Sequence, residues 1–285
     1  MFTATARCPA AISFIFKAYL PDGTFGRISD YLSFGSVGVG CTTDKMILTR
    51  VSRSKKNLIL FNGRKIRIPT VVTALKEITR TFLAVSIKSE LPLGCGFGIS
   101  GAAALTSLFA SNKLLNLKIP KRRLAEIAHY AEIKEKTGLG TVATQINGGF
   151  LLKTRPGIPP LFKRLNFKGR KIFACVFDRI PTPKILADKD KIRVINREAD
   201  RAMMKLMETE KLTLESVFDI SWQFTLASGL ATEKIIKLIS KIKRAGGCAT
   251  EAILGETVLS TIKVKNENYP VFELTVTNET VAIQP

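Results

Sequence analysis

The sequence has few of the residues that metal centres and disulfide-rich folds require. Its 285 residues include one histidine, His129, and five cysteines that stand singly along the chain. With so few histidines and no paired cysteines, the sequence indicates neither a Ser-His-Asp mechanism nor a zinc site, and it indicates no disulfide framework. Lys17 interrupts the apolar stretch near the start, so we expect no membrane span and no membrane partner. A signal-peptide layout is missing too, and we expect a cytoplasmic protein.

Acidic residues are scarce compared with basic ones. The 44 lysines and arginines against 23 aspartates and glutamates give a formal net charge of +21 at pH 7. Such a charge attracts polyanions, among them ATP, an acidic substrate and RNA. The basic residues are scattered, without the interleaved aromatic side chains that stack on bases. We therefore do not expect nucleic acid as a partner.

The most informative segment is residues 92–104, which read Pro-Leu-Gly-Cys-Gly-Phe-Gly-Ile-Ser-Gly-Ala-Ala-Ala. Alternating apolar residues predict a strand over 82–88, and helical spacing predicts a helix after the segment. The glycines between them form a turn, where the missing Cβ lets the backbone approach a ligand closely. Because amides at a helix start are unpaired, the turn indicates a polyphosphate site. The alternative is a tight structural turn, since neither a P-loop ending nor a dinucleotide fingerprint is present.

Two polar residues are candidates for the chemistry next to this turn. Ser100 either caps the helix or contacts a phosphate oxygen or Mg²⁺. Glu132 lies in a helix predicted over 120–136, on a face otherwise lined by small side chains, and its alternative role is a surface ion pair with Lys136. His129 either orients its neighbours or is a buried, hydrogen-bonded histidine.

The remaining pattern indicates an α+β fold, because strands and helices do not alternate regularly. In the first half we expect strands at 46–51 and 57–61, a hairpin turn at Asn62-Gly63, and a helix from 70 to 82. The proline-rich stretch 154–170 is the expected domain boundary. Beyond it we expect a strand at 171–177, helices at 190–208, 213–227 and 232–244, and strands at 256–264 and 271–277.

Residues 92–103 resemble the second motif of the GHMP kinases, usually written P-x-x-x-G-L-G-S-S-A-A. Within that superfamily the chain is most similar to the archaeal pantoate kinases. The segments that carry this likeness follow in family order at 35–40, 128–133, 137–140, 148–149, 155–160 and 252–258.

The resemblance implies a two-domain GHMP kinase fold with the active site between the domains. Residues 1–160 would form a domain like ribosomal protein S5 domain 2, and residues 161–285 a ferredoxin-like domain. It further implies ATP and Mg²⁺ as cofactors, a small-molecule substrate, pantoate, as partner and, as one option, a second copy of the chain.

The resemblance also implies roles for individual residues. It implies catalytic roles for Ser100 and Glu132, which would hold Mg²⁺. Thr141 is a third catalytic candidate, because its hydroxyl can hold the acceptor hydroxyl by hydrogen bonding. The residues implied to bind the nucleotide phosphates are Gly94, Gly96, Phe97, Gly98, Ile99, Ser100, Gly101 and Ala102. The residues implied for acceptor binding are Ser36, Arg155, Lys184, Gly246 and Gly247. The alternative for Arg155 and Lys184 is a surface charge, and the alternative for the Gly246-Gly247 pair is a helix C-cap followed by a turn.

Two positions depart from the family pattern. Thr141 stands where many pantoate kinases have an aspartate, and Ala11 stands where the first motif usually has a histidine. The expected function is ATP-dependent phosphorylation of pantoate to 4-phosphopantoate in archaeal coenzyme A biosynthesis. The alternatives are another GHMP small-molecule kinase, a catalytically weakened homologue that senses ATP or a metabolite, and an RNA-binding protein on a kinase-like fold.

Overall fold

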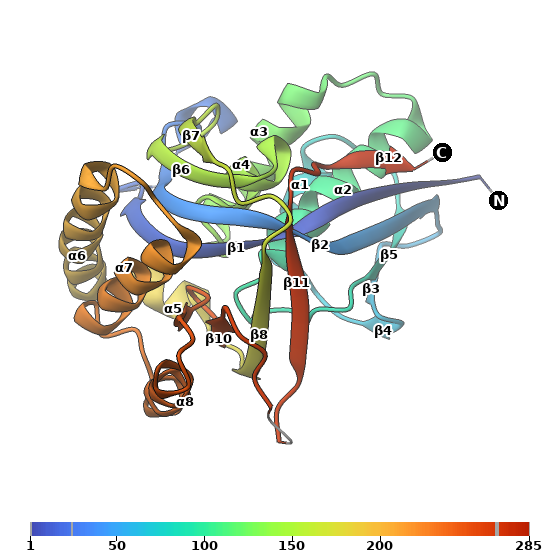
Figure 1. Cartoon of the computed structure of the whole chain (residues 1–285). Coiled ribbons are helices and arrows are strands. Elements are labelled where there is room, and N and C mark those ends of the chain that lie inside the picture. The colour runs from blue at the N-terminus through green and yellow to red at the C-terminus, as the bar shows by residue number, and fades with distance from the viewer. Residues whose placement is uncertain (1, 24, 266–267, 285) are drawn as a thin grey trace.

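Two long antiparallel strands form the centre of the computed structural model, which describes residues 2–23, 25–265 and 268–284. Strands β1 (Thr3–Tyr19) and β2 (Gly35–Arg53) pair along most of their length, with irregularities between Pro9 and Ala11 and between Ser13 and Ile15 (Figure 1). The apolar run 10–16, for which the sequence predicted no element, lies in β1. Helices cover both faces of this strand. Because a strand buried on both faces does not alternate apolar and polar residues, the period-two pattern that predicts strands is missing here.

Further strands extend the sheet from β2. Strand β5 (Leu83–Lys88) pairs with β2 and, in parallel, with β3 (Leu58–Phe61). The predicted hairpin is confirmed, because β3 pairs with β4 (Arg64–Lys65) around Asn62 and Gly63, both at positive φ. A second hairpin joins β6 (Phe150–Arg155) to β7 (Leu161–Leu165), and β6 pairs with β2.

Helix α2 (Ile99–Leu115) lies against β1 and β2, and α1 (Pro69–Lys76) and α3 (Lys121–Lys134) pack on it. Residues Ile99 and 101–111 of α2 are all buried, as expected of a helix covered on all sides. The expected helix over 70–82 is wrong beyond Lys76. There Thr81 N donates to Thr79 Oγ1 and Leu83 N donates to Asn57 Oδ1, so local polar side chains redirect the chain into β5.

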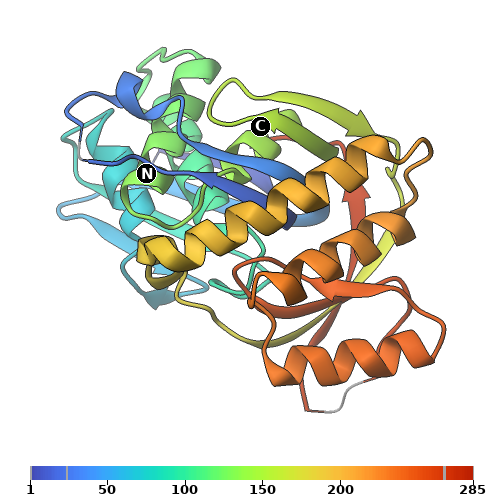
Figure 2. The same cartoon turned by 90° about the vertical axis from the view of Figure 1, so that its left-hand side faces the viewer.

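The second half of the chain confirms the expected strand and helices. A sheet of β8 (Lys171–Asp178), β9 (Ala249–Glu251), β10 (Glu256–Ser260) and β11 (Val271–Thr277) packs against α7 (Leu214–Ala227) and α8 (Glu233–Arg244). The long helix α6 (Lys189–Glu208), which follows the short α5 (Thr182–Ala187), crosses in front of β1 and packs on it (Figure 2). The strand expected over 256–264 ends at Ser260.

The chain returns to its first sheet at the end. Strand β11 pairs with β8 through most of its length and with β2 at Val276 and Thr277, and β12 (Ala282–Gln284) pairs with β1. The mixed, non-alternating arrangement confirms the α+β class. The stretch expected as a domain boundary contains the β6–β7 hairpin, and the division at residue 160 stays a prediction. No helix in the described part of the chain is long and apolar enough to cross a membrane.

One buried carboxyl group in this half has no hydrogen-bond partner. Glu251 in β9 is 0% exposed, and neither of its oxygens has a partner among the described residues. Burial raises the pKa of Glu251 to about 8, with a further increase from the charge of Glu256 and an opposing effect of Lys191. The folded protein therefore keeps this carboxyl protonated at neutral pH, whereas the unfolded chain loses the proton near pH 4.5.

This difference predicts a pH-dependent stability. Between about pH 4.5 and 8 the folded state binds one proton more at Glu251 than the unfolded state, so this group lowers the unfolding free energy as pH rises. The slope for one proton is about 1.4 kcal/mol per pH unit. We expect Glu251→Gln, which keeps the shape without the titration, to stabilise the protein more at pH 8 than at pH 5. Urea unfolding of both proteins at both pH values checks this, and an equal effect at both would contradict it.

Candidate active site

The glycine turn between β5 and α2 adopts backbone angles that favour glycine. Gly94, Gly96 and Gly98 have φ of +86°, +86° and +63°. A Cβ on Gly96 would lie 2.9 Å from Cβ of Ala252, and one on Gly98 would lie 3.0 Å from the carbonyl oxygen of Ala11. Both the angles and the close packing therefore require residues without side chains.

The carbonyl groups of this turn are bonded inward, toward the rest of the protein. Phe97 O accepts from Ala11 N at 3.0 Å, and Gly98 O accepts from Gln145 Nε2 at 3.0 Å. Cys95 O accepts from Thr257 Oγ1 at 2.9 Å. By contrast, none of the amides from Gly96 to Gly101 donates a hydrogen bond to any part of the chain that the structure describes. The turn and the first turn of α2 thus present a run of free donors.

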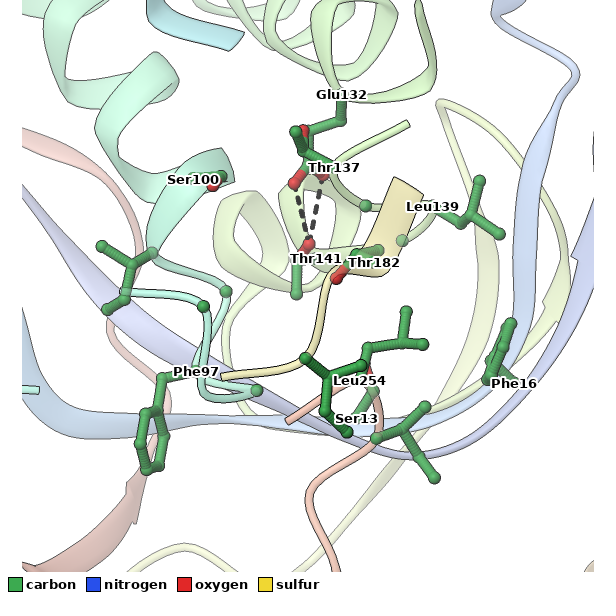
Figure 3. A pocket seen from close by; sticks show the side chains of 18 of the residues that line it. Ser13, Phe16, Phe97, Ser100, Glu132, Thr137, Leu139, Thr141, Thr182 and Leu254 are labelled. Atoms are coloured by element: carbon green, nitrogen blue, oxygen red, sulfur yellow. Dashed lines mark hydrogen bonds between the residues drawn. The ribbon is translucent and has the colours of Figure 1, made fainter. Parts of the chain in front are cut away.

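Ser100 lies in this first turn and does not cap the helix. The residue at the N-cap is Gly98, in the left-handed conformation and without a side-chain hydrogen bond. This excludes the capping role considered from the sequence. The Ser100 side chain instead lines a cavity of about 220 Å³ (Figure 3).

Glu132 closes one side of the same cavity. It extends from α3, is 1% exposed, and both of its carboxylate oxygens lie 3.1 Å from the Thr141 hydroxyl, which donates to them (Figure 3). Val142 N donates to it at 3.4 Å. A Cβ on Gly101 would lie 2.8 Å from Oε1, so the carboxylate lies beside the start of α2. Burial raises the pKa of Glu132 to about 7. The surface ion pair with Lys136 is not formed.

A buried lysine, which the sequence did not point out, lies next to this site. Lys153 in β6 is 3% exposed, and its Nζ donates to Gly140 O at 2.9 Å. It makes no ion pair with a described carboxylate. Burial lowers the pKa of Lys153 to about 8, and the charge of Glu132 opposes this shift. A Cβ on Gly140 would meet both Lys153 Nζ and Ser36 Oγ, so these two polar groups flank one point of the cavity wall. The sequence feature that could have indicated this buried lysine is its position directly after three apolar residues of β6.

His129 has the structural role that the sequence left open. It is fully buried, its Nε2 donates to Phe34 O at 2.9 Å, and its Nδ1 has no described partner. Burial lowers the pKa of His129 to about 4, and the charge of Lys153 lowers it further. The imidazole is therefore neutral near pH 7.

The cavity gathers many, but not all, of the predicted site residues. Lining it are Ser36, Gly94, Gly96, Phe97, Gly98, Ile99, Ser100, Glu132 and Thr141. Gly101 and Ala102 follow, buried, in α2. Arg155 is exposed at the end of β6 and donates to Pro159 O, and Lys184 is exposed in α5. Gly246 and Gly247 follow α8, where Gly247 packs on Ile242 and Ile262. None of these last four lines the cavity, and their role in acceptor binding stays a prediction.

Comparisons with known proteins agree with this geometry. Residues 68–149, which include the glycine turn and Glu132, match the model of the GHMP kinases N terminal domain. The chain is 29% identical over 237 residues to a pantoate kinase of Methanocaldococcus jannaschii, covering 81% of this chain and 85% of that protein. It is 28% identical to a pantoate kinase of Thermococcus kodakarensis, covering 75% and 74%.

The chain is therefore similar to the GHMP kinases, with the matched domain model over residues 68–149 and pantoate kinase relatives over most of its length. Its fold agrees: a solved structure titled as a phosphotransferase related to the CoA biosynthesis pathway superposes with a TM-score of 0.84 at 21% identity, covering 99% of both chains. Mevalonate-3-kinase from Thermoplasma acidophilum superposes with a TM-score of 0.68 at 14% identity, covering 99% and 98%. The expected two-domain GHMP kinase fold is confirmed.

The single histidine of the protein allows a direct test of the buried site. Because the pKa of His129 is lowered to about 4, we expect its ring to stay neutral, with the proton on Nε2, from pH 5 to pH 9. NMR of the imidazole resonances of the folded protein measures this without assignment problems, since no other histidine is present. A titration midpoint near the ordinary value of about 6.5 would contradict the buried arrangement.

Proposed function

We propose that this GHMP kinase transfers the γ-phosphoryl group of ATP to the primary hydroxyl of pantoate, giving 4-phosphopantoate in archaeal coenzyme A biosynthesis. The observation that carries the proposal is the run of free amides from Gly96 to Gly101 at the edge of a cavity that holds a buried carboxylate, Glu132. The relatives named as pantoate kinases support the choice of acceptor.

The nucleotide end of the site consists of backbone. Free amides at the start of a 17-residue helix combine hydrogen-bond donors with the positive end of the helix dipole, and both favour phosphate. The inward bonding of the carbonyls keeps acceptor oxygens away from the phosphates, where they would repel. Gly94, Gly96, Phe97, Gly98, Ile99, Ser100, Gly101 and Ala102 are the proposed phosphate-binding residues.

The residues present fit a magnesium ion that arrives with the nucleotide. Mg²⁺ prefers oxygen ligands and is often held by one or two carboxylates together with substrate phosphates. The Glu132 carboxylate accepts only from a hydroxyl and one amide and has no cation bonded to it, and Ser100 lines the same cavity. No cluster of three or more acidic, histidine or cysteine ligands occurs among the described residues, so phosphates and water would complete the shell. Bound there, the ion would neutralise charge on the transferred phosphoryl group.

Thr141 replaces the aspartate of other family members and acts by orientation. The Thr141 hydroxyl donates a hydrogen bond to Glu132. The Thr141 oxygen can therefore accept a hydrogen bond from the acceptor hydroxyl. In phosphoryl transfer with a loose transition state, positioning matters more than proton removal. The acceptor oxygen bonds to the γ-phosphorus as the bond to the β,γ-bridging oxygen breaks, and the hydroxyl proton passes to the phosphoryl group.

Lys153 and Ser36 supply the polar groups at the acceptor end. The Lys153 ammonium is hydrogen-bonded to a neutral carbonyl, and the charge of Glu132 offsets only part of the cost of its burial. A pantoate carboxylate near Ser36 would provide the missing negative charge. Lys153, bonded to Gly140 in the cavity wall, is therefore the proposed cation for the acceptor carboxylate, in addition to the predicted Arg155 and Lys184, which do not line the cavity.

We expect Ser100→Ala and Glu132→Gln each to lower kcat by about 10²-fold or more, because electrostatic positioning supplies most of the catalysis. Glu126→Gln is the matched control: this carboxylate lies on the same helix and pairs with Arg122 and Arg123 away from the cavity. Its kcat should stay within about twofold of the wild type. Coupled assay of ADP release at saturating ATP measures all three, and full activity of Glu132→Gln would remove Glu132 from the mechanism.

The acceptor is tested by a panel of pantoate, mevalonate and homoserine with ATP and Mg²⁺. We expect ADP release with pantoate and formation of 4-phosphopantoate, detected by ³¹P NMR. If mevalonate or homoserine is phosphorylated and pantoate is not, the protein is a kinase, and pantoate is rejected as its acceptor. Binding of ATP without transfer to any of the three would indicate a sensor instead of an enzyme.

A further inference from the structure

One wall of the cavity is apolar and comes from a distant part of the chain. Ile253 and Leu254, between β9 and β10, line it together with Phe16, Leu139 and Ile180. In Figure 3, Leu254 lies across the cavity from Glu132 and Thr141. The cavity thus has a polar side, where the phosphoryl group would be transferred, and an apolar side opposite.

The segment that carries Leu254 is held firmly at both ends. Ile253 N donates to Ser13 O at 2.9 Å, and Ala252 N donates to Thr257 O at 2.9 Å. A Cβ on Gly255 would lie 2.1 Å from the carbonyl carbon of Cys95, so the segment is in close contact with the glycine turn. Leu254 is therefore positioned relative to both β1 and the proposed phosphate site.

Leu254 also has an unfavourable backbone conformation. Its φ is +63°, and the other described non-glycine residues at positive φ are Asn62, Asn116, Lys118 and Lys136, all polar. For an L-residue with a large side chain this conformation is strained, and such strain persists where the surroundings impose it and often at ligand sites. Glycine would adopt it freely, so a leucine side chain at this point indicates a use for the side chain.

We propose that Leu254 determines acceptor specificity by contacting the carbon next to the reacting hydroxymethyl group. This inference rests on the proposed function. In pantoate that carbon is quaternary and carries two methyl groups, and its hydroxymethyl neighbour must reach Thr141. With the hydroxyl at Thr141, an acceptor of this size presents its methyl groups to the apolar wall. A cavity with Leu254 in place favours acceptors with the two methyl groups over acceptors that lack them.

The test compares pantoate with 2,4-dihydroxybutanoate, which has the same hydroxyls and carboxylate but no methyl groups. For the wild type we expect kcat/KM to be about 10²-fold higher for pantoate, because one apolar carbon in a fitted pocket contributes about 10-fold or more. Leu254→Ala should lose about 10-fold of this preference, mainly through a higher KM for pantoate. Its KM for ATP should not change.

The Leu254→Gly variant distinguishes the effect of the lost side-chain contacts from the effect of the backbone strain. Glycine removes the same contacts and relieves the strain, so this variant should lose the preference as Leu254→Ala does while melting no lower than the wild type. Leu226→Ala, at an exposed leucine of α7, is the matched control and should keep the preference.

An unchanged preference in both Leu254 variants would overturn the inference, as would a loss in Leu254→Ala that Leu254→Gly does not share. Equal use of both acceptors by the wild type would overturn it as well and leave the proposed kinase intact. Transfer to neither acceptor by the wild type would overturn the proposed function, and this inference with it.

Discussion

The arrangement of the glycine turn is the constraint on which the rest of the site depends. Its carbonyls are bonded by Ala11 of β1, Gln145 of α4 (Thr141–Asn147) and Thr257 of β10, so three separate parts of the chain hold it. A peptide whose carbonyl is bonded inward turns its neighbouring amides outward. The free donors belong to the start of α2 itself, and long-range hydrogen bonds from both halves of the fold fix the direction in which they point.

Two buried charges define the chemistry beside this turn without contacting each other. Glu132 and Lys153 both lie in surroundings of low polarity, where burial disfavours the charged form of each. Each has only neutral hydrogen-bond partners: the Thr141 hydroxyl and an amide for Glu132, and a carbonyl for Lys153. The proposed magnesium ion beside the carboxylate and acceptor carboxylate beside the ammonium would supply the opposite charges.

The division of the cavity into polar and apolar sides follows from the topology. The polar side is built by α2, α3 and the segment before α4, which are consecutive in the first half of the chain. The apolar side includes Ile180 after β8 and the segment after β9, which come from the second half. Phe16 and Leu139 of the first half complete the apolar side, so both halves of the chain build the cavity.

The amino-acid sequence by itself determined most of the local elements and the glycine turn between β5 and α2. Periodicity located β5, α2, α3 and the helices α6 to α8, and the glycine turn with Ser100 is a pattern of neighbours along the chain, whereas Glu132 was joined to it by the family resemblance. It did not locate β1, whose burial on both faces removes the polar alternation. Only the tertiary structure decided that Leu254 lines the cavity, that Lys153 is bonded to Gly140 in its wall, and that Arg155, Lys184 and the Gly246-Gly247 pair do not line it. These positions depend on strand pairing and on contacts between residues more than a hundred positions apart, such as Ile253 with Ser13, and no local pattern encodes such a contact.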